Sequence, residues 1–185
     1  MKQHGMSRIC IRQAKAPDVK KVSAILQEAA NWLIEQGTPL WKADELAPAR
    51  IRAEVSTGLF WLAEVDGKSA GCIRFQTEDR LFWPDVEDGE SAFIHRFAVR
   101  RKFAGGGVSG ALLDWARART RLLGKRYLRL DCEAKTLKLC RLYERAGFRK
   151  HSERQVGPYW VARYECEMPP AVRREPVRET YAGDE

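Results

Sequence analysis

The spacing of apolar residues in the first third of the chain predicts two helices that follow a short strand. Residues 9–12 have the composition of a strand. From Pro17 to Glu35, apolar side chains recur every three or four positions, which is typical of an amphipathic helix. Residues 37–39 contain a glycine and a proline that end this helix. A second helix is expected over residues 44–55.

An alternation of apolar and polar residues dominates the next part of the chain. Residues 59–65 and 69–76 each alternate as a half-buried strand does, and Asp66-Gly67 between them is typical of a two-residue hairpin turn. A polar insertion, residues 78–90, separates this hairpin from another strand over residues 91–99. The aromatic residues of the insertion either contact a ligand or fold back on the core, and the pattern alone leaves both alternatives open.

The second half of the chain continues to mix strands with helices. A glycine-rich turn follows the strand at 91–99 and leads into a helix over residues 111–123. A strand over residues 127–131 and a helix over residues 136–146 come next, and Gly147 is placed to end that helix. Residues 159–168 alternate again and predict a final strand. These elements indicate an α/β (α+β) fold.

Composition and length restrict the classes of protein that this sequence can represent. The chain has 185 residues, of which 44% are hydrophobic and 31% charged, as expected for one domain with one core. We place that domain at residues 1–168 and expect the polar residues 169–185 to be disordered. No apolar run reaches the ~18 residues that cross a bilayer, and no signal region opens the chain. We therefore expect a cytoplasmic protein without a membrane partner.

The number and spacing of the cysteines and the distribution of charge restrict the kinds of binding site that we expect. The five cysteines are scattered and none form a C-x-x-C pair, so we expect neither a disulfide framework nor a metal site. The net charge is +8, and basic residues are concentrated in residues 96–129. This concentration could be a solvated helix face, an attraction for a multiply anionic cofactor, or a nucleic-acid surface. It fits none of the known nucleic-acid modules, so we expect no nucleic-acid partner.

The glycine-rich turn is the main candidate for a binding site. Where a strand feeds a helix through consecutive glycines, free backbone N–H groups and the positive end of the helix dipole point to one place. Without Cβ atoms at Gly105, Gly106 and Gly107, an anion can approach the chain closely. The pattern is neither a Walker loop nor the dinucleotide fingerprint. It predicts either a phosphate or pyrophosphate site, or only a flexible loop before a helix.

Two segments in the same order resemble motifs of the GCN5-related N-acetyltransferases (GNAT). Ala98-Val99, the turn at residues 104–109 and Leu112-Leu113 are similar to the diphosphate-binding motif of that family, although Ala104 and Ser109 depart from its usual residues. The stretch LDCEAKTLKLCRLYERAGF, residues 130–148, looks like the later motif that ends in Tyr-Glu-x-x-Gly-Phe. Thr136 stands there in place of the usual Asn. The resemblance covers roughly residues 59–167.

The resemblance implies a fold, an activity and a set of cofactor contacts. The fold is a mixed, mostly antiparallel central sheet with a splayed parallel strand pair, flanked by helices. The activity is direct transfer of an acetyl group, in a ternary complex, from acetyl-CoA to a primary amine of a small molecule or a protein N-terminus. A non-catalytic acyl-CoA sensor or interaction module is the alternative, and a homodimer stays open. The residues expected to contact acetyl-CoA are Phe97, Ala98, Val99, Ala104, Gly105, Gly106, Gly107, Val108, Ser109, Gly110, Thr136, Leu139 and Tyr143.

The resemblance also assigns a general acid, whereas the base follows from the strand pattern. Tyr143 matches the tyrosine of the family beside the sulfur, and a phenol with an ordinary pKa of ~10 can protonate a thiolate. It could instead be a packed aromatic residue. Alternation places His95 on one strand face with Phe93, Phe97 and Val99. His95, with an ordinary pKa of ~6.5, is therefore a candidate base, or else a histidine hydrogen-bonded for structure. Glu90 is the second candidate for the base.

Three tryptophans are candidates for contact with the acceptor amine. Trp32 and Trp41 flank the break between the first two helices, and Trp83 lies in the polar insertion. In the resembled fold the region between the first two helices overhangs the acceptor. The alternative is that these side chains belong to the core, because large aromatic residues are usually mostly buried.

Overall fold

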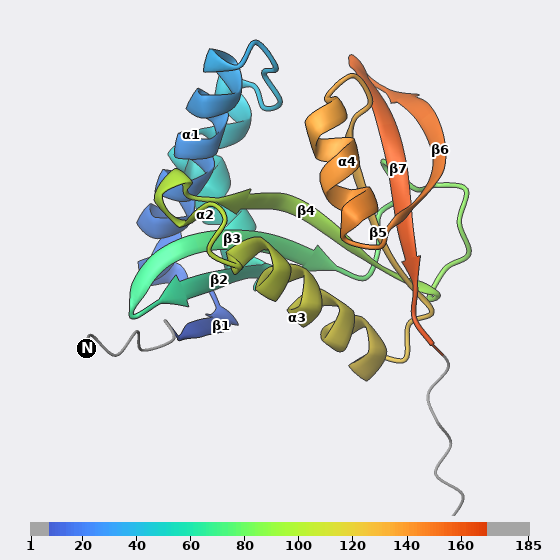
Figure 1. Ribbon diagram of the computed structural model, residues 1–185, viewed down its shortest axis with the longest axis horizontal. Coiled ribbons are helices and arrows are strands. Elements are labelled where there is room, and N and C mark those ends of the chain that lie inside the picture. The colour runs from blue at the N-terminus through green and yellow to red at the C-terminus, as the bar shows by residue number, and fades with distance from the viewer. Residues whose placement is uncertain (1–7, 170–185) are drawn as a thin grey trace, which may run out of the picture.

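The computed structural model describes residues 8–169 and shows one mixed sheet with helices on both faces (Figure 1). Within these residues the seven strands lie in the order β1-β2-β3-β4-β5-β7-β6. Neighbouring strands are antiparallel except for the parallel pair β4 and β5. The strands are β1 Ile9–Gln13, β2 Phe60–Val65, β3 Lys68–Gln76, β4 Ser91–Val99, β5 Tyr127–Glu133, β6 Arg149–Val156 and β7 Tyr159–Glu167.

The helices divide the core into two clusters, one on each face of the sheet. The α-helices within the described residues are α1 Val19–Glu35, α2 Pro48–Ser56, α3 Val108–Leu122 and α4 Leu137–Arg145. Side chains of α1 and α2 form one cluster with Leu62, Cys72 and Ala98 of the sheet. Side chains of α3 and α4 form the other cluster, which includes Ile73 and Ile94. These residues were expected in helices and strands because of their apolar spacing, and they form the two cores.

Strands β4 and β5 run side by side for only part of their length. Their pairing extends from Ser91 opposite Tyr127 to Ile94 opposite Leu130 and then stops. The remaining residues, 95–99 of β4 and 131–133 of β5, have no ladder between them. The splayed parallel pair and the mostly antiparallel sheet expected from the sequence are confirmed. The divergence leaves unpaired strand groups facing an opening in the sheet.

A β-bulge in β4 changes which side chains share a face. The register of β3 against β4 shifts between Cys72 and Arg74, and Arg96 adopts a left-handed φ of 50°. An extra residue in one strand reverses the alternation of the residues that follow it. Phe97 consequently packs with the α3 and α4 cluster. The prediction that His95 shares a face with Phe97 and Val99 is therefore wrong, because Arg96 interrupts the period of two.

Two helix boundaries differ from the expected ones for local reasons. The helix expected over residues 44–55 is divided into a short 3-10 turn, Ala43–Leu46, and α2, which begins at Pro48. Proline lacks an N–H and fits the first turn of a helix, so it starts a new one. Helix α3 begins at Val108, earlier than expected, because Gly107 caps it with a φ of 81°. The tail expected to be disordered, residues 169–185, lies outside the described residues except for Pro169.

The polar insertion between β3 and β4 folds back on the sheet. Trp83 is only 2% exposed, and its ring lies between the guanidinium groups of Arg129 and Arg163, at 5.3 and 4.7 Å. Asp85 accepts two hydrogen bonds from Arg163, of 2.5 and 2.9 Å. The sequence left two alternatives for the aromatic residues of the insertion, contact with a ligand or folding back on the core. Trp83 folds back on the core. The insertion is thereby fixed over β4 and β7.

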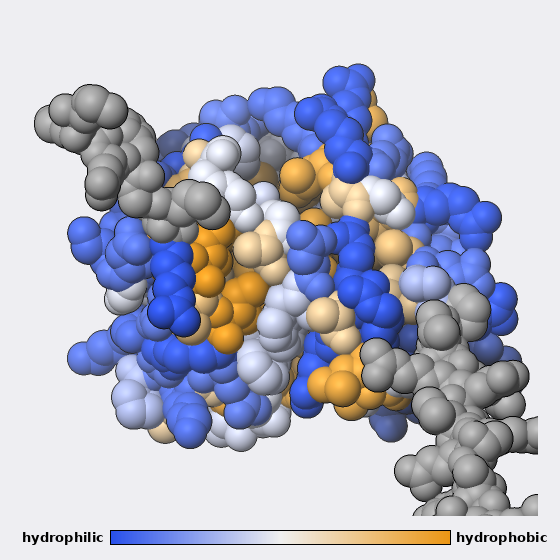
Figure 2. Space-filling model, turned by 60° about the horizontal axis from the view of Figure 1, so that its bottom comes forward, coloured by the Kyte–Doolittle hydropathy of each residue, from blue (hydrophilic) through white to orange (hydrophobic). Residues whose placement is uncertain are grey.

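The surface of the molecule is mostly hydrophilic, as expected from the composition. Figure 2 turns the lower side of Figure 1 forward and shows mostly hydrophilic residues, interrupted by separate apolar patches. Within residues 8–169, the helices fall short of the length and apolarity that crossing a bilayer would require.

Candidate active site

A cavity of about 590 Å³ opens where β4 and β5 diverge. Its walls come from both sides of the sheet and from α1, α2 and α4, and they divide into two regions. One region surrounds the glycine turn before α3 and includes Ala104, Gly105 and Ser109. The other lies beyond His95 and includes Trp41, Arg96 and other polar and aromatic residues. The opening in the sheet therefore joins two differently built regions.

The glycine turn presents several free backbone donors. Within residues 8–169, the N–H groups of Gly105, Gly107, Val108, Ser109 and Gly110 make no hydrogen bond. They lie at the N-terminus of α3, where the helix dipole is positive. A Cβ at Gly105 would meet nothing within 4 Å, so the surface beside it is open. This arrangement can hold a phosphate or pyrophosphate through main-chain contacts alone.

The basic side chains near the turn differ in whether they face the cavity. Arg101 lines the cavity, and its guanidinium lies 4.3 Å from the centre of the Trp32 ring. Arg100 points elsewhere and donates a hydrogen bond of 2.7 Å to Glu28. Of the basic residues just before the glycines, Arg101 is therefore the one best placed to add charge to an anion site. Trp32 supports that arginine from α1.

Tyr143 lies on α4 at the inner wall of the cavity. Its side chain packs against Phe97, Phe148 and Tyr164, with ring centroids 6.1–6.4 Å apart. Its hydroxyl has no hydrogen-bond partner among the described residues. Burial, together with neighbouring Cys132 and Asp131, raises the pKa of Tyr143 far above its ordinary value. The phenol therefore keeps its proton at neutral pH and can donate it to an anion in the cavity.

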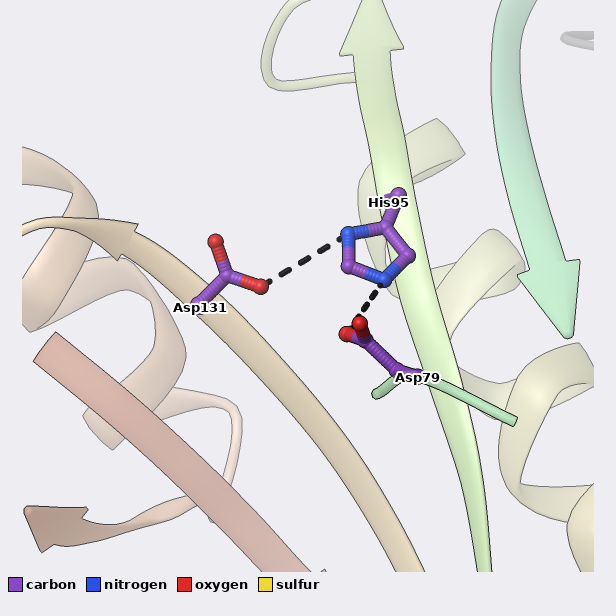
Figure 3. Close-up of side chains that lie close together, drawn as sticks. All are labelled: Asp79, His95 and Asp131. Carbon is purple, nitrogen blue, oxygen red and sulfur yellow. Dashed lines mark ion pairs between the residues drawn. The ribbon is translucent and has the colours of Figure 1, made fainter. Parts of the chain in front are cut away.

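His95 lies between two carboxylates that come from different elements (Figure 3). Its Nε2 is 3.0 Å from Asp79 Oδ2, and its Nδ1 is 3.6 Å from Asp131 Oδ1. Asp79, from the loop after β3, is itself fixed by hydrogen bonds from the backbone of Leu81 and Phe82. His95 and Asp131 line the cavity, whereas Asp79 lies behind the ring. An imidazolium formed here would be stabilised from both sides.

The two carboxylates differ in their electrostatics. Burial raises the pKa of Asp131 to about 6, although the charge of His95 opposes the effect. Asp79 is also penalised by burial, but hydrogen bonding and the charge of His95 lower its pKa overall. Near neutral pH, Asp79 is the fixed negative charge and Asp131 is close to its titration range. Asp131, beside His95, can therefore take up and release a proton near neutrality.

The same three side chains could bind a metal ion. One ligand atom from each of Asp79, His95 and Asp131 lies within 4.8 Å of the other two. Two carboxylates and an imidazole are common ligands of divalent metals. The expectation that the protein binds no metal did not consider this group, because its members are far apart in the sequence.

Three arginines surround one glutamate in the second region of the cavity. Glu54 of α2 is 3.3 Å from both Arg50 Nε and Arg96 Nη2, and 3.7 Å from Arg74 Nη1. Arg96 also lies over Trp41, 5.7 Å from the ring centre. We call Arg50, Arg74, Arg96 and Glu54 the arginine cluster. It gives this region an excess of positive charge beside His95.

The structure brings many of the predicted site residues together. The predicted residues that line the cavity are Trp32, Trp41, His95, Phe97, Ala98, Val99, Ala104, Gly105, Ser109, Leu139 and Tyr143. Gly106, Gly107, Val108 and Gly110 belong to the turn and the first turn of α3 but do not line it, and Val108 is buried in the core. Thr136 caps α4 without a side-chain hydrogen bond and is buried away from the cavity.

Trp83 and Glu90 also lie away from the cavity, and the sequence did not identify several other residues at the site. Trp83 is buried between arginines and does not reach the acceptor region, so its predicted contact with the acceptor is not supported. Glu90 precedes β4 at the end remote from the glycine turn and does not line the cavity. The sequence suggested that Asp79, among other acidic residues of the insertion, could attract a cation, but it did not connect Asp79 or Asp131 with His95 and gave no role to the arginine cluster. Only contacts between distant segments reveal them.

Comparison with known proteins agrees with this geometry. The sequence model of the acetyltransferase (GNAT) family matches residues 26–148. The uncharacterized N-acetyltransferase YesJ of Bacillus subtilis is 29% identical over 139 residues, which cover 71% of this chain and 76% of YesJ. A GNAT-family acetyltransferase structure from Listeria monocytogenes has a TM-score of 0.71 at 23% identity, covering 86% of this chain and 94% of that one. PaiA N-acetyltransferase from Thermoplasma acidophilum, solved with coenzyme A, has a TM-score of 0.67 at 15% identity, covering 84% and 98%.

Proposed function

Because the chain belongs to the acetyltransferase (GNAT) family and is an acetyl-CoA-dependent N-acetyltransferase, we propose that it acetylates a primary amine by direct attack in a ternary complex. The acceptor amine is on a small molecule or a peptide. The observation that carries this proposal is the single cavity that joins the free amides of the glycine turn, Tyr143 and His95. Both substrates can occupy this cavity at once, as a ternary complex requires.

Acetyl-CoA supplies an activated thioester, and the free amides before α3 are suited to hold its pyrophosphate. The free N–H groups of Gly105, Gly107, Val108, Ser109 and Gly110 lie at a positive helix end, and backbone contacts do not depend on the side chains at Ala104 and Ser109. Arg101 adds one positive charge at the same wall. The unpaired edge groups of β4 after residue 95 can bind the amides of the pantetheine arm.

Tyr143 and His95 are placed for the two proton transfers of the reaction. Tyr143 keeps its phenol proton because burial raises its pKa, and it donates that proton to the departing thiolate. His95 accepts the proton of the amine, directly or through a water molecule, while Asp79 orients the ring and stabilises its charged form. Asp131 on the cavity wall attracts the ammonium form of the acceptor.

The experiment measures release of free thiol from acetyl-CoA with a panel of primary amines. We expect turnover by the wild-type protein and a fall in kcat of roughly 100-fold or more for His95→Gln, because a positioned base contributes about that much. His151→Gln is the matched control, since His151 is exposed and does not line the cavity. EDTA in parallel reactions separates a base from a metal ligand, and activity that requires a metal would contradict the proposed role of His95.

The alternative is a protein that binds acyl-CoA without catalysis. In that case coenzyme A would raise the melting temperature, but no amine in the panel would release thiol above the background rate. That outcome would overturn the catalytic proposal and leave only the cofactor site.

A further inference from the structure

The arginine cluster carries more positive charge than its carboxylate neutralises. Three guanidinium groups lie within 3.7 Å of Glu54, the one carboxylate they share in the described structure. Glu45 also lines this part of the cavity and reduces the excess to one positive charge, and its carboxylate is held by the backbone N–H of Lys42. The side chain of Arg50 is half exposed, but those of Arg74 and Arg96 are only 27% and 9% exposed, and guanidinium charge withdrawn from solvent is unfavourable unless an anion completes the group.

Arg74 has an unusually large unused hydrogen-bonding capacity. Its guanidinium makes no hydrogen bond to any described residue, and its one ion pair, to Glu54, is long at 3.7 Å. Arg74 Nε is buried without a partner. Glu54 Oε2, 3.7 Å from Arg74 Nη1, is likewise buried without a hydrogen bond, so the two groups do not satisfy each other. A buried donor left without an acceptor is unfavourable and indicates a missing partner. Arginine presents its donors as a planar fork that matches a carboxylate.

Arg96 leaves further donors beside Arg74. Its two hydrogen bonds, to Glu45 O and Glu54 Oε1, are both 3.3 Å long and both come from Nη2. The hydroxyl of Tyr159, which lines the same region, is buried beside the carboxylate of Glu45 but makes no well-formed hydrogen bond to it. Two guanidinium groups and a phenol with free donors therefore face one region of the cavity. A small anionic group could satisfy all of them.

The cluster lies next to the place where the amine must react. Arg74 on β3 is the cross-strand partner of His95 on β4, and Arg96 follows His95 in the chain. Side chains of such a pair are separated by only about 5 Å at their Cβ atoms. On the other side of His95 lies Asp131, whose carboxylate suits an ammonium group. Positive and negative charges thus lie on opposite sides of His95 within one cavity.

We propose that the acceptor is a small primary amine that also carries a carboxylate, as a free amino acid does. Its carboxylate binds Arg74 and Arg96, while its amino group lies at His95 and Asp131. This assignment rests on the proposed amine acetylation and names the class of acceptor. The aromatic walls formed by Trp41, Phe82 and Tyr159 favour an apolar or aromatic side chain on that acceptor.

The test compares acceptors that differ only in the carboxylate. Each aromatic or aliphatic amino acid is assayed with acetyl-CoA beside its amide and its decarboxylated amine. We expect kcat/KM for the free acid to exceed that of both analogues by roughly 100-fold, because loss of one partner from a buried charged pair costs several kcal/mol. Arg74→Met should remove this preference by lowering kcat/KM for the acid while changing the decarboxylated amine little.

Matched variants keep the result interpretable. Arg80→Met is the control, because Arg80 lies exposed in the insertion and pairs with exposed Asp88 outside the cavity. Arg74→Lys retains the charge without the fork, and we expect it to restore part of the preference. If Arg74→Met fails to fold, Arg74→Lys and the acceptor series with wild-type protein still decide the question.

The outcomes separate this inference from the proposed function. Equal or faster acetylation of the amide and the decarboxylated amine would overturn the carboxylate site and leave amine acetylation intact. Turnover restricted to peptides without a nearby carboxylate would do the same. Failure of every amine, with coenzyme A still bound, would overturn both proposals.

Discussion

Replacement of Tyr143 by phenylalanine removes one oxygen atom from the wall of the cavity. The ring packs against Phe97, Phe148 and Tyr164, and the residue is only 6% exposed, so phenylalanine should occupy the same position. The lost hydroxyl has no protein partner, and we expect the free energy of unfolding to change by no more than about 0.5 kcal/mol. Any large effect of Tyr143→Phe must then come from chemistry.

The expected loss of activity follows from the role of a proton donor. A positioned general acid contributes about 10²–10⁴ in rate, which corresponds to about 3–5 kcal/mol of the activation barrier. We therefore expect kcat of Tyr143→Phe to fall at least about 100-fold. Because burial raises the pKa of Tyr143, wild-type activity should not decline through ionisation of this phenol below about pH 10.

The assay combines thiol release with thermal denaturation, with and without coenzyme A. Tyr164→Phe is the matched control, because Tyr164 packs beside Tyr143 and its hydroxyl donates a hydrogen bond of 3.0 Å to Glu144. That variant should lose about 1 kcal/mol of stability, or about 2–4 °C in Tm, and keep its kcat. A Tyr143→Phe protein with kcat within threefold of wild type would refute the assignment of the acid.

Two further predictions test the turn and the buried carboxylate. Gly107→Ala forces a left-handed φ of 81° on a residue with a Cβ, so it should lose about 1–2 kcal/mol of stability and also bind coenzyme A more weakly in a thermal-shift titration. Gly67→Ala, with a φ of 75° in a remote hairpin, should lose stability alone, and equal losses of affinity would contradict the site. Burial raises the pKa of Asp131 from 3.8 to about 6, so the contribution of this carboxyl group to the stability of the wild type falls as the pH rises from about 4 to about 6, and Asp131→Asn lacks that loss. In denaturant titrations, the stability of Asp131→Asn relative to wild type should grow by about 2–3 kcal/mol between pH 4 and pH 7, and a constant difference would contradict the shift.

Local features of the site could be predicted from the sequence, whereas features made by distant segments could not. The glycine turn and Tyr143 lie in short segments whose residues resemble family motifs, so their neighbours in the chain are enough to identify them. Asp79 and Asp131 meet His95 only because an insertion folds back and two strands diverge. No spacing in the sequence reports that contact.

Two further differences between the predicted and the observed structure also have causes that local sequence patterns do not show. The extra residue in β4 is Arg96, which adopts a left-handed φ of 50° without being a glycine, so the residue type gives no sign of the bulge. Trp83 looks exposed in a polar insertion, but it is buried because two arginines from other strands enclose it. Arg129 and Arg163 lie too far from Trp83 in the sequence for this contact to be predicted.

The bulge at Arg96 lets β4 present separate sets of side chains to the two substrates of the proposed reaction. His95, before the bulge, faces the proposed acceptor region, and Phe97, after it, packs with Tyr143. Evolution can therefore change acceptor preference upstream of Arg96 without altering the grip on the acyl donor downstream. Deletion of Arg96 would place Phe97 directly after His95 and opposite Ile73, so the strand would lose its bulge while the remaining side chains kept their present faces.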